Sequence, residues 1–131
     1  NFWIVEGIAN YFESLNKGSD GKFTIGKADA GRLPAAVHRR VVDGYYIPLA
    51  ELVALGKQDL QSRADLGPLY SQAAGVATFL MEYDGGRYRG PLSRYLQAVY
   101  AGKATDSTLA ELCGTSYAEL DRQYLEFLRG L

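Results

Sequence analysis

The sequence predicts a mainly α-helical fold, an orthogonal or irregular bundle of about six helices with at most one small β-hairpin. Along most of the chain, apolar residues recur at intervals of three and four positions, the period of a helix that buries one face. Alternation with period two, which is typical of strands, is confined to two short stretches. Helices therefore account for nearly all of the regular structure that we expect.

Size and composition bound the class of protein. The chain has 131 residues, enough for one domain with its own core, so we expect a single helical domain over residues 1–131. A formal net charge of -1, from 14 basic and 15 acidic residues, predicts no electrostatic binding to nucleic acid. No stretch approaches the roughly 18 apolar residues of a membrane-spanning helix, so no membrane span is predicted in this chain.

The first predicted helix covers the N-terminal residues. Its apolar side chains follow the i, i+4, i+7 spacing and are expected to face the core; they are Ile4, Ile8, Tyr11, Phe12 and Leu15. The opposite face is polar and consists of Glu6, Asn10, Glu13 and Lys17. This pattern predicts an amphipathic helix with one buried and one solvated side.

Two short strands are predicted in the next part of the chain. Turn-forming residues at positions 16–21 end the first helix, and Lys22–Ile25 alternates between glycines as a short strand does. Tyr45–Ile47 follows an Asp-Gly turn and is the second candidate strand. The two segments are the predicted partners of the hairpin.

Helices are predicted on both sides of the second strand. The first lies within Arg32–Val42, with Pro34 tolerable only in its first turn. Pro48 then begins a short helix over Leu49–Leu55, which Gly56 ends. The longest helix runs from residue 67 to about residue 83, and its apolar arc is so wide that it must pack on more than one side.

Three further helices complete the predicted bundle. One lies around residues 91–101, after the turn at residues 84–86. The last two each begin with a sequence of the form S/T-x-x-E, which is the pattern of a helix-capping box. These boxes are Thr108–Glu111 and Ser116–Glu119.

A motif in the first helix suggests a function. Residues 3–13 read WIVEGIANYFE, which resembles the W-x-x-E-G-x-A-x-Y-x-E helix of the gluzincin metallopeptidases. That group includes relatives of aminopeptidase N and the bacterial peptidase-MA-like domains. In that group an H-E-x-x-H helix supplies two histidine ligands to zinc, and the glutamate of the E-G pair supplies the third ligand. The resemblance implies that Glu6 is a zinc ligand.

The first half of such a site is absent from this sequence. The chain contains one histidine, His38, and no H-E-x-x-H. The resemblance therefore implies that the chain is the C-terminal part of a zinc peptidase domain, and that the H-E-x-x-H part lies upstream in the same protein. The intact protein would bind zinc and cleave a peptide or protein substrate. We expect no zinc in this chain alone, because a catalytic zinc needs three protein ligands.

A second resemblance concerns Tyr70. Residues 69–76, LYSQAAGV, are similar to a helix of the same group that carries a tyrosine near its start. In aminopeptidase-like members this tyrosine donates a hydrogen bond to the oxyanion on zinc, so the resemblance implies a catalytic role for Tyr70. A phenol in the first turn would also stand at the positive end of the helix dipole. Tyr70 and Glu6 are then expected to face the same groove.

The residues leave structural alternatives open. Periodicity alone makes Glu6 part of a solvated helix face, and Tyr70 is one of ten tyrosines and lies in an apolar stripe. The alternative function is a non-catalytic helical module that binds peptides or a partner protein. Gly7 costs a helix roughly 1 kcal/mol relative to alanine, so we expect a second helix to approach it closely. If that helix is the absent metal-binding one, an apolar patch around Trp3 should be exposed.

Two other side chains that could in principle react or bind a metal are expected to be structural. His38 is followed by Arg39 and Arg40, and the chain has no second histidine with which it could share a metal ion. We therefore interpret these three residues as part of the exposed face of a helix. Cys113 is the only cysteine, so it forms no intramolecular disulfide and indicates no redox compartment. We expect Cys113 to be a small apolar filler near a helix end.

Overall fold

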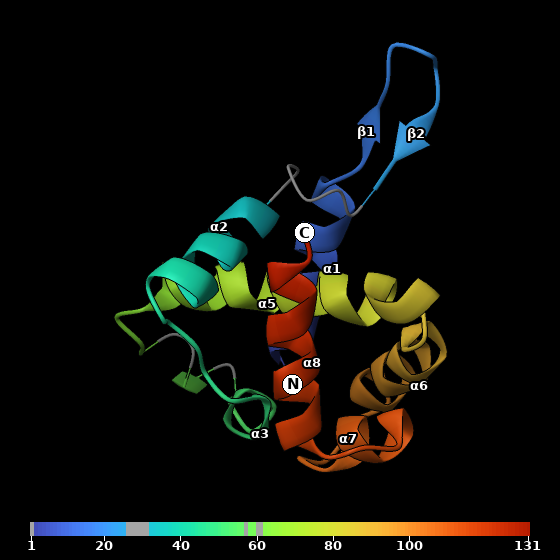
Figure 1. The fold of residues 1–131 in the computed structure, drawn as a ribbon. Helices are drawn as coiled ribbons and strands as arrows, with labels where there is room; N and C mark the ends of the chain where they lie inside the picture. The colour runs from blue at the N-terminus through green and yellow to red at the C-terminus, as the bar shows by residue number, and fades with distance from the viewer. Residues whose placement is uncertain (1, 26–31, 57, 60–61) are drawn as a thin grey trace.

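A computed structural model describes residues 2–25, 32–56, 58–59 and 62–131, and Figure 1 shows how their helices are arranged. Seven α-helices and one two-stranded antiparallel hairpin lie within these ranges, which confirms the predicted fold class. The helices are α1 (Phe2–Glu13), α2 (Leu33–Val37), α3 (Leu49–Leu52), α5 (Leu66–Glu82), α6 (Arg89–Tyr100), α7 (Thr108–Cys113) and α8 (Tyr117–Arg129). None of the helices in the described ranges is long and apolar enough to cross a membrane.

Helix α5 is the centre of the fold. In Figure 1, α1 passes behind it and α8 crosses in front of it. Every residue of α5 from Ser71 to Leu80 is buried. At Gly75 an added Cβ would collide with the hydroxyl of Tyr124 on α8 and would lie 2.9 Å from the Cβ of Ala36 on α2. The prediction that this helix packs on more than one side is confirmed.

One cluster of buried apolar side chains joins α5 to the other described helices. Each of the seven helices contributes to it, including short α2 through Leu33 and α7 through Leu109. Aromatic rings fill much of the space between α5 and α8, where Phe79 lies 5.8 Å from Tyr124 and 5.7 Å from Phe127, measured between ring centroids. The short helices are therefore stabilised by packing, since helices of this length are marginal on their own.

The buried face of α1 differs from the one that periodicity predicts. The buried residues are Trp3, Ile4, Gly7, Asn10 and Tyr11. Phe12 is 58% exposed and Leu15 is 54% exposed, although both belong to the predicted core stripe. The physical reason is Gly7, because its lack of a side chain lets α5 approach this line of the helix. The contact turns Trp3 inward and Phe12 outward.

The hairpin also pairs differently from the prediction. β1 (Asn16–Lys17) pairs with β2 (Phe23–Thr24) across the turn that follows α1. The predicted partner, Tyr45–Ile47, is not a strand. Instead, the side-chain amide of Gln72 on α5 accepts a hydrogen bond from the Ile47 N–H at 2.9 Å and donates one to the Ile47 carbonyl at 2.7 Å. A buried side chain thus replaces the neighbouring strand.

The two predicted capping boxes have different outcomes. Ser116 is the N-cap of α8, and its hydroxyl accepts a hydrogen bond from the Glu119 N–H at 3.1 Å, as predicted. Thr108 does not cap α7, because it is the first helical residue and Ser107 precedes it as the N-cap. The Thr108 hydroxyl instead accepts from the Thr105 N–H in the preceding turn. The sequence pattern is one residue out of register with this helix.

Gly7→Ala is expected to destabilise the protein, although alanine is the better helix former by roughly 1 kcal/mol. An added Cβ would lie 2.5 Å from the backbone oxygen of Ala73, so α1 and α5 must separate. Overpacking of this kind costs about 1–3 kcal/mol of the free energy of unfolding. Urea denaturation measures the difference.

Gly90→Ala on α6 is the matched control. A Cβ at Gly90 would approach only the guanidinium nitrogens of Arg94, at 3.9 and 4.0 Å. Its free energy of unfolding should stay the same or rise by at most ~1 kcal/mol. Equal stabilisation in both variants would show that α1 and α5 are not in close contact at Gly7.

Candidate functional site

The two residues that the resemblance assigns to a zinc site lie on helices that pack directly against each other. Gly7 of α1 faces Ala73 and Ala77 of α5, since its added Cβ would lie 2.5 Å from the Ala73 oxygen and 3.1 Å from the Ala77 Cβ. One turn further along α1, Tyr11 donates a hydrogen bond to Glu82 near the end of α5. In Figure 1 α1 runs upright behind α5, which runs across the view, so the two helices cross.

Tyr70 shares a face of α5 with Met81, since the two residues are eleven positions apart, a net rotation of about 20°. Met81 lines a pocket together with Ile8 of α1. On α1, Glu6 and Ile8 are rotated about 100° from Gly7 in opposite senses. The expectation that Glu6 and Tyr70 face the same groove therefore stays a prediction.

Glu6 is half-buried on α1. Its main-chain oxygen accepts a hydrogen bond from the side-chain amide of Asn10 at 2.9 Å, one turn later in the helix. In the part of the chain that the structure describes, the Glu6 carboxylate has no hydrogen-bond or ion-pair partner. A half-buried carboxylate without a partner is available as a ligand for a cation.

Tyr70 is also half-buried, and its ring packs against the core cluster. Its hydroxyl has no hydrogen-bond partner within the described ranges, unlike the hydroxyls of Tyr11, Tyr45, Tyr46 and Tyr88, which all donate to side chains. The expected position in the first turn is wrong, because α5 begins at Leu66 and Tyr70 is its fifth residue. The helix dipole acts within the first turn, so it adds little at this phenol.

The expectation of an exposed patch around Trp3 is wrong. Trp3 is completely buried, and its ring centroid lies 6.3 Å from that of Tyr95 on α6. The helix that approaches Gly7 is α5, which belongs to this chain, rather than an absent metal-binding helix. Gly7 is a point of close helix contact, as predicted, with α5 as the partner, and Trp3 packs near Tyr95 of α6.

The described residues do not complete a metal site. Nowhere among them do three His, Cys, Asp or Glu side chains lie together in a group that could hold a metal ion. Glu6 supplies one carboxylate, whereas catalytic zinc takes three protein ligands. The donor set present here therefore fits only part of a zinc site.

A second polar arrangement, near the other end of the α1–α5 pair, was not predicted. The Tyr11 hydroxyl donates to Glu82 at 2.5 Å, and the second oxygen of Glu82 lies 3.3 Å from Nη2 of Arg89. Burial, followed by the hydrogen bond to Glu82, raises the pKa of Tyr11 to about 12, so the phenol stays protonated at neutral pH. These residues are far apart in sequence, and no local pattern links them.

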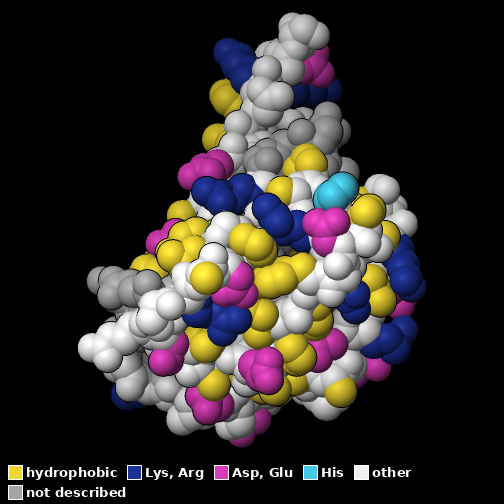
Figure 2. All heavy atoms as spheres, turned by 90° about the vertical axis from the view of Figure 1, so that its left-hand side faces the viewer, with side chains coloured by type: hydrophobic (Ala, Val, Ile, Leu, Met, Phe, Trp, Pro, Cys, Tyr) yellow, Lys and Arg dark blue, Asp and Glu magenta, His cyan; other side chains and the backbone are white. Residues whose placement is uncertain are grey.

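His38 lies on the surface and Cys113 lies at the end of α7, as expected. The His38 side chain is 61% exposed and lies 3.4 Å from Asp43. Figure 2 shows the histidine on a face where basic, acidic and apolar side chains are interspersed, so no charge of one sign dominates that face. Cys113 is half-buried, and burial raises the pKa of its thiol to about 11. The thiolate that reacts or binds metal is therefore scarce at neutral pH.

Comparisons with known proteins do not assign the chain to a family. No family model matches it. No curated protein and no solved structure matches it either. The resemblance of the motif in α1 and of the segment around Tyr70 is therefore the basis for a functional proposal.

Proposed function

We propose that this chain is the C-terminal helical subdomain of a zinc-dependent peptidase of the gluzincin type. In this proposal Glu6 is the third zinc ligand and Tyr70 is the hydrogen-bond donor to the transition state. The observation that carries it is the motif in α1, supported by two half-buried polar side chains that have no partner among the described residues and lie on the packed helices α1 and α5.

The chemistry of the two side chains suits the roles. An ionised carboxylate is a normal zinc ligand, and a helix that is packed tightly against its neighbour holds it in a fixed position. A phenol donates a hydrogen bond to a developing oxyanion without carrying charge itself. In the intact site, zinc would polarise the substrate carbonyl and activate a water molecule. The two histidines and the general-base glutamate would come from the upstream part of the protein.

Zinc content tests the role of Glu6. The 131-residue chain alone should hold close to no zinc after dialysis, since it contributes one ligand of three. The longer protein that includes the upstream H-E-x-x-H should hold about one zinc per chain, as a site with three protein ligands does. Glu6→Gln in that protein should lower the zinc content well below one equivalent. Elemental analysis after dialysis against a weak chelator measures all three samples.

Glu13→Gln is the matched control, because Glu13 is an exposed carboxylate on the same helix. It should leave the zinc content unchanged. A zinc content of about one per chain in the Glu6→Gln protein would show that Glu6 is not a zinc ligand. An upstream sequence without H-E-x-x-H would remove the enzymatic proposal, and the alternative, a helical module that binds peptides or a partner protein, would take its place.

A further inference from the structure

A small apolar pocket lies on the flank of α1 opposite to Glu6. Its volume is about 230 Å³, below the about 300–1,000 Å³ of pockets that enclose a drug-sized ligand. Ile8, one of its lining residues, follows Gly7 by one residue and is rotated about 100° away from the α5 contact, in the sense opposite to Glu6. The apolar and aromatic lining comes from three helices: Ile8, Tyr11, Phe12, Met81, Leu92 and Leu96.

The size and lining suit one apolar side chain. The remaining lining residues are Ser93 and Arg89, so Arg89 is the charged residue of the pocket. Phe12 is 58% exposed where it lines the cavity, and both Ser93 and Arg89 are exposed. The pocket is therefore reachable from solvent and has an apolar interior with a cation at its edge.

Arg89 is held in a fixed position at this edge. Its Nε donates to the Met81 carbonyl at 2.5 Å, and its Nη2 lies 3.3 Å from Glu82. Its guanidinium also packs on Gly86, where an added Cβ would lie 2.8 Å from the Arg89 Cζ. Among the described residues its third nitrogen, Nη1, has no hydrogen-bond partner. The guanidinium is thus oriented in advance, with donors still available.

Another arginine in this chain binds two carboxylates at the same time. Arg122 uses Nε and Nη2 for Glu119, at 3.0 and 2.6 Å, and uses Nη1 for Glu126 at 2.9 Å. A guanidinium has five N–H donors in a planar fork, so pairing with one carboxylate leaves others for a second acceptor. Arg89, with Glu82 on one side, has the same capacity at Nη1.

We propose that this pocket binds the C-terminal residue of a peptide, with its apolar side chain in the cavity and its terminal carboxylate on Nη1 of Arg89. Arg89 itself lines this small cavity, so a carboxylate on Arg89 lies close to the apolar group in the cavity. Within a polypeptide, the C-terminal residue carries a main-chain carboxylate and an apolar side chain on the same Cα. The inference concerns the flank of α1 opposite to Glu6, and it stands whether or not the protein is a peptidase.

A pair of short peptides tests this. N-acetyl-Ala-Leu with a free carboxylate should give saturable changes in the amide NMR signals of Ile8, Phe12 and Leu96. The same dipeptide as its C-terminal amide should bind at least ~10-fold more weakly, because it loses the charge-assisted hydrogen bond. Equal affinity for the two peptides, or no saturable change at the pocket, would overturn the proposal.

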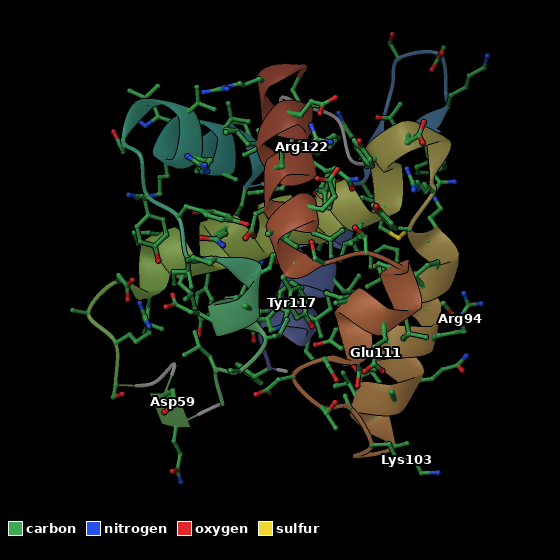
Figure 3. All side chains as sticks on the ribbon, turned by 60° about the horizontal axis from the view of Figure 1, so that its bottom comes forward. Asp59, Arg94, Lys103, Glu111, Tyr117 and Arg122 are labelled. Carbon is green, nitrogen blue, oxygen red and sulfur yellow. The ribbon has the colours of Figure 1, made fainter. Side chains whose placement is uncertain are left out.

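Three variants locate the binding groups. Arg89→Gln should abolish the preference for the free acid, and Ser93→Trp should weaken both peptides by filling the pocket from an exposed position. Ser93→Trp keeps the test decisive if loss of the Arg89 contacts unfolds the protein. Arg94→Gln is the control, since Arg94 points outward from α6 in Figure 3 and does not line the pocket. An equal loss of preference in Arg94→Gln and Arg89→Gln would contradict the proposal.

Discussion

Trp3→Ala is expected to lower the free energy of unfolding by about 3–5 kcal/mol, the usual cost of deleting a large buried aromatic side chain. Trp3 is completely buried and packs near Tyr95, so its removal leaves a cavity between α1 and α6. This loss is a large share of the about 5–15 kcal/mol that stabilises a typical domain. Urea denaturation followed by far-ultraviolet circular dichroism measures it without depending on tryptophan fluorescence.

Phe12→Ala on the same helix is the control. Phe12 is 58% exposed and has a ring contact with Tyr11, so its truncation should cost less than about 2 kcal/mol of the free energy of unfolding, well below the loss for Trp3→Ala. The two variants together test which face of α1 is buried. The apolar periodicity predicts that Phe12 is buried, and the expected docking patch requires that Trp3 is exposed. A larger loss for Phe12→Ala than for Trp3→Ala would show that the helix is rotated as periodicity predicts.

Tyr70→Phe is expected to lower kcat by roughly 10²–10³ in the protein that carries the complete zinc site, the usual effect of losing one oxyanion donor. The substitution removes only the hydroxyl, which has no hydrogen-bond partner among the described residues. The packing of the ring against the core is retained, so zinc content and stability should not change. Steady-state kinetics on a peptide substrate, together with elemental analysis, separate these effects.

Tyr100→Phe is the matched control for this experiment. Tyr100 is 75% exposed at the end of α6, so its hydroxyl should contribute nothing to kcat. An unchanged kcat in Tyr70→Phe would make Tyr70 a structural tyrosine of α5. Simultaneous loss of zinc and activity would indicate misfolding and would withdraw support from the catalytic role.

Local sequence predicted one feature of this region that the structure confirms, the close helix contact at Gly7. The role of Glu6 in the W-x-x-E-G-x-A-x-Y-x-E pattern stays a prediction. The partner of Gly7 was misjudged, because a motif specifies that something must approach Gly7 but not which helix does so. The pocket at Arg89 had no sequence signal, since its lining comes from helices that are distant in the chain.

The sequence by itself determined the features that depend on neighbouring residues. Helical period, glycine and proline positions and the Ser116 cap all act within a few residues, so the mainly α-helical class and the long central helix were predictable. Tertiary packing decided which face of α1 is buried and why Tyr45–Ile47 is not a strand. Both depend on α5, through the contact with Gly7 and through the Gln72 amide that bonds the Ile47 backbone. Such long-range contacts override a weak local preference. The burial of side chains and the hydrogen bonding of backbone groups stabilise the folded chain more than the local conformational preference does.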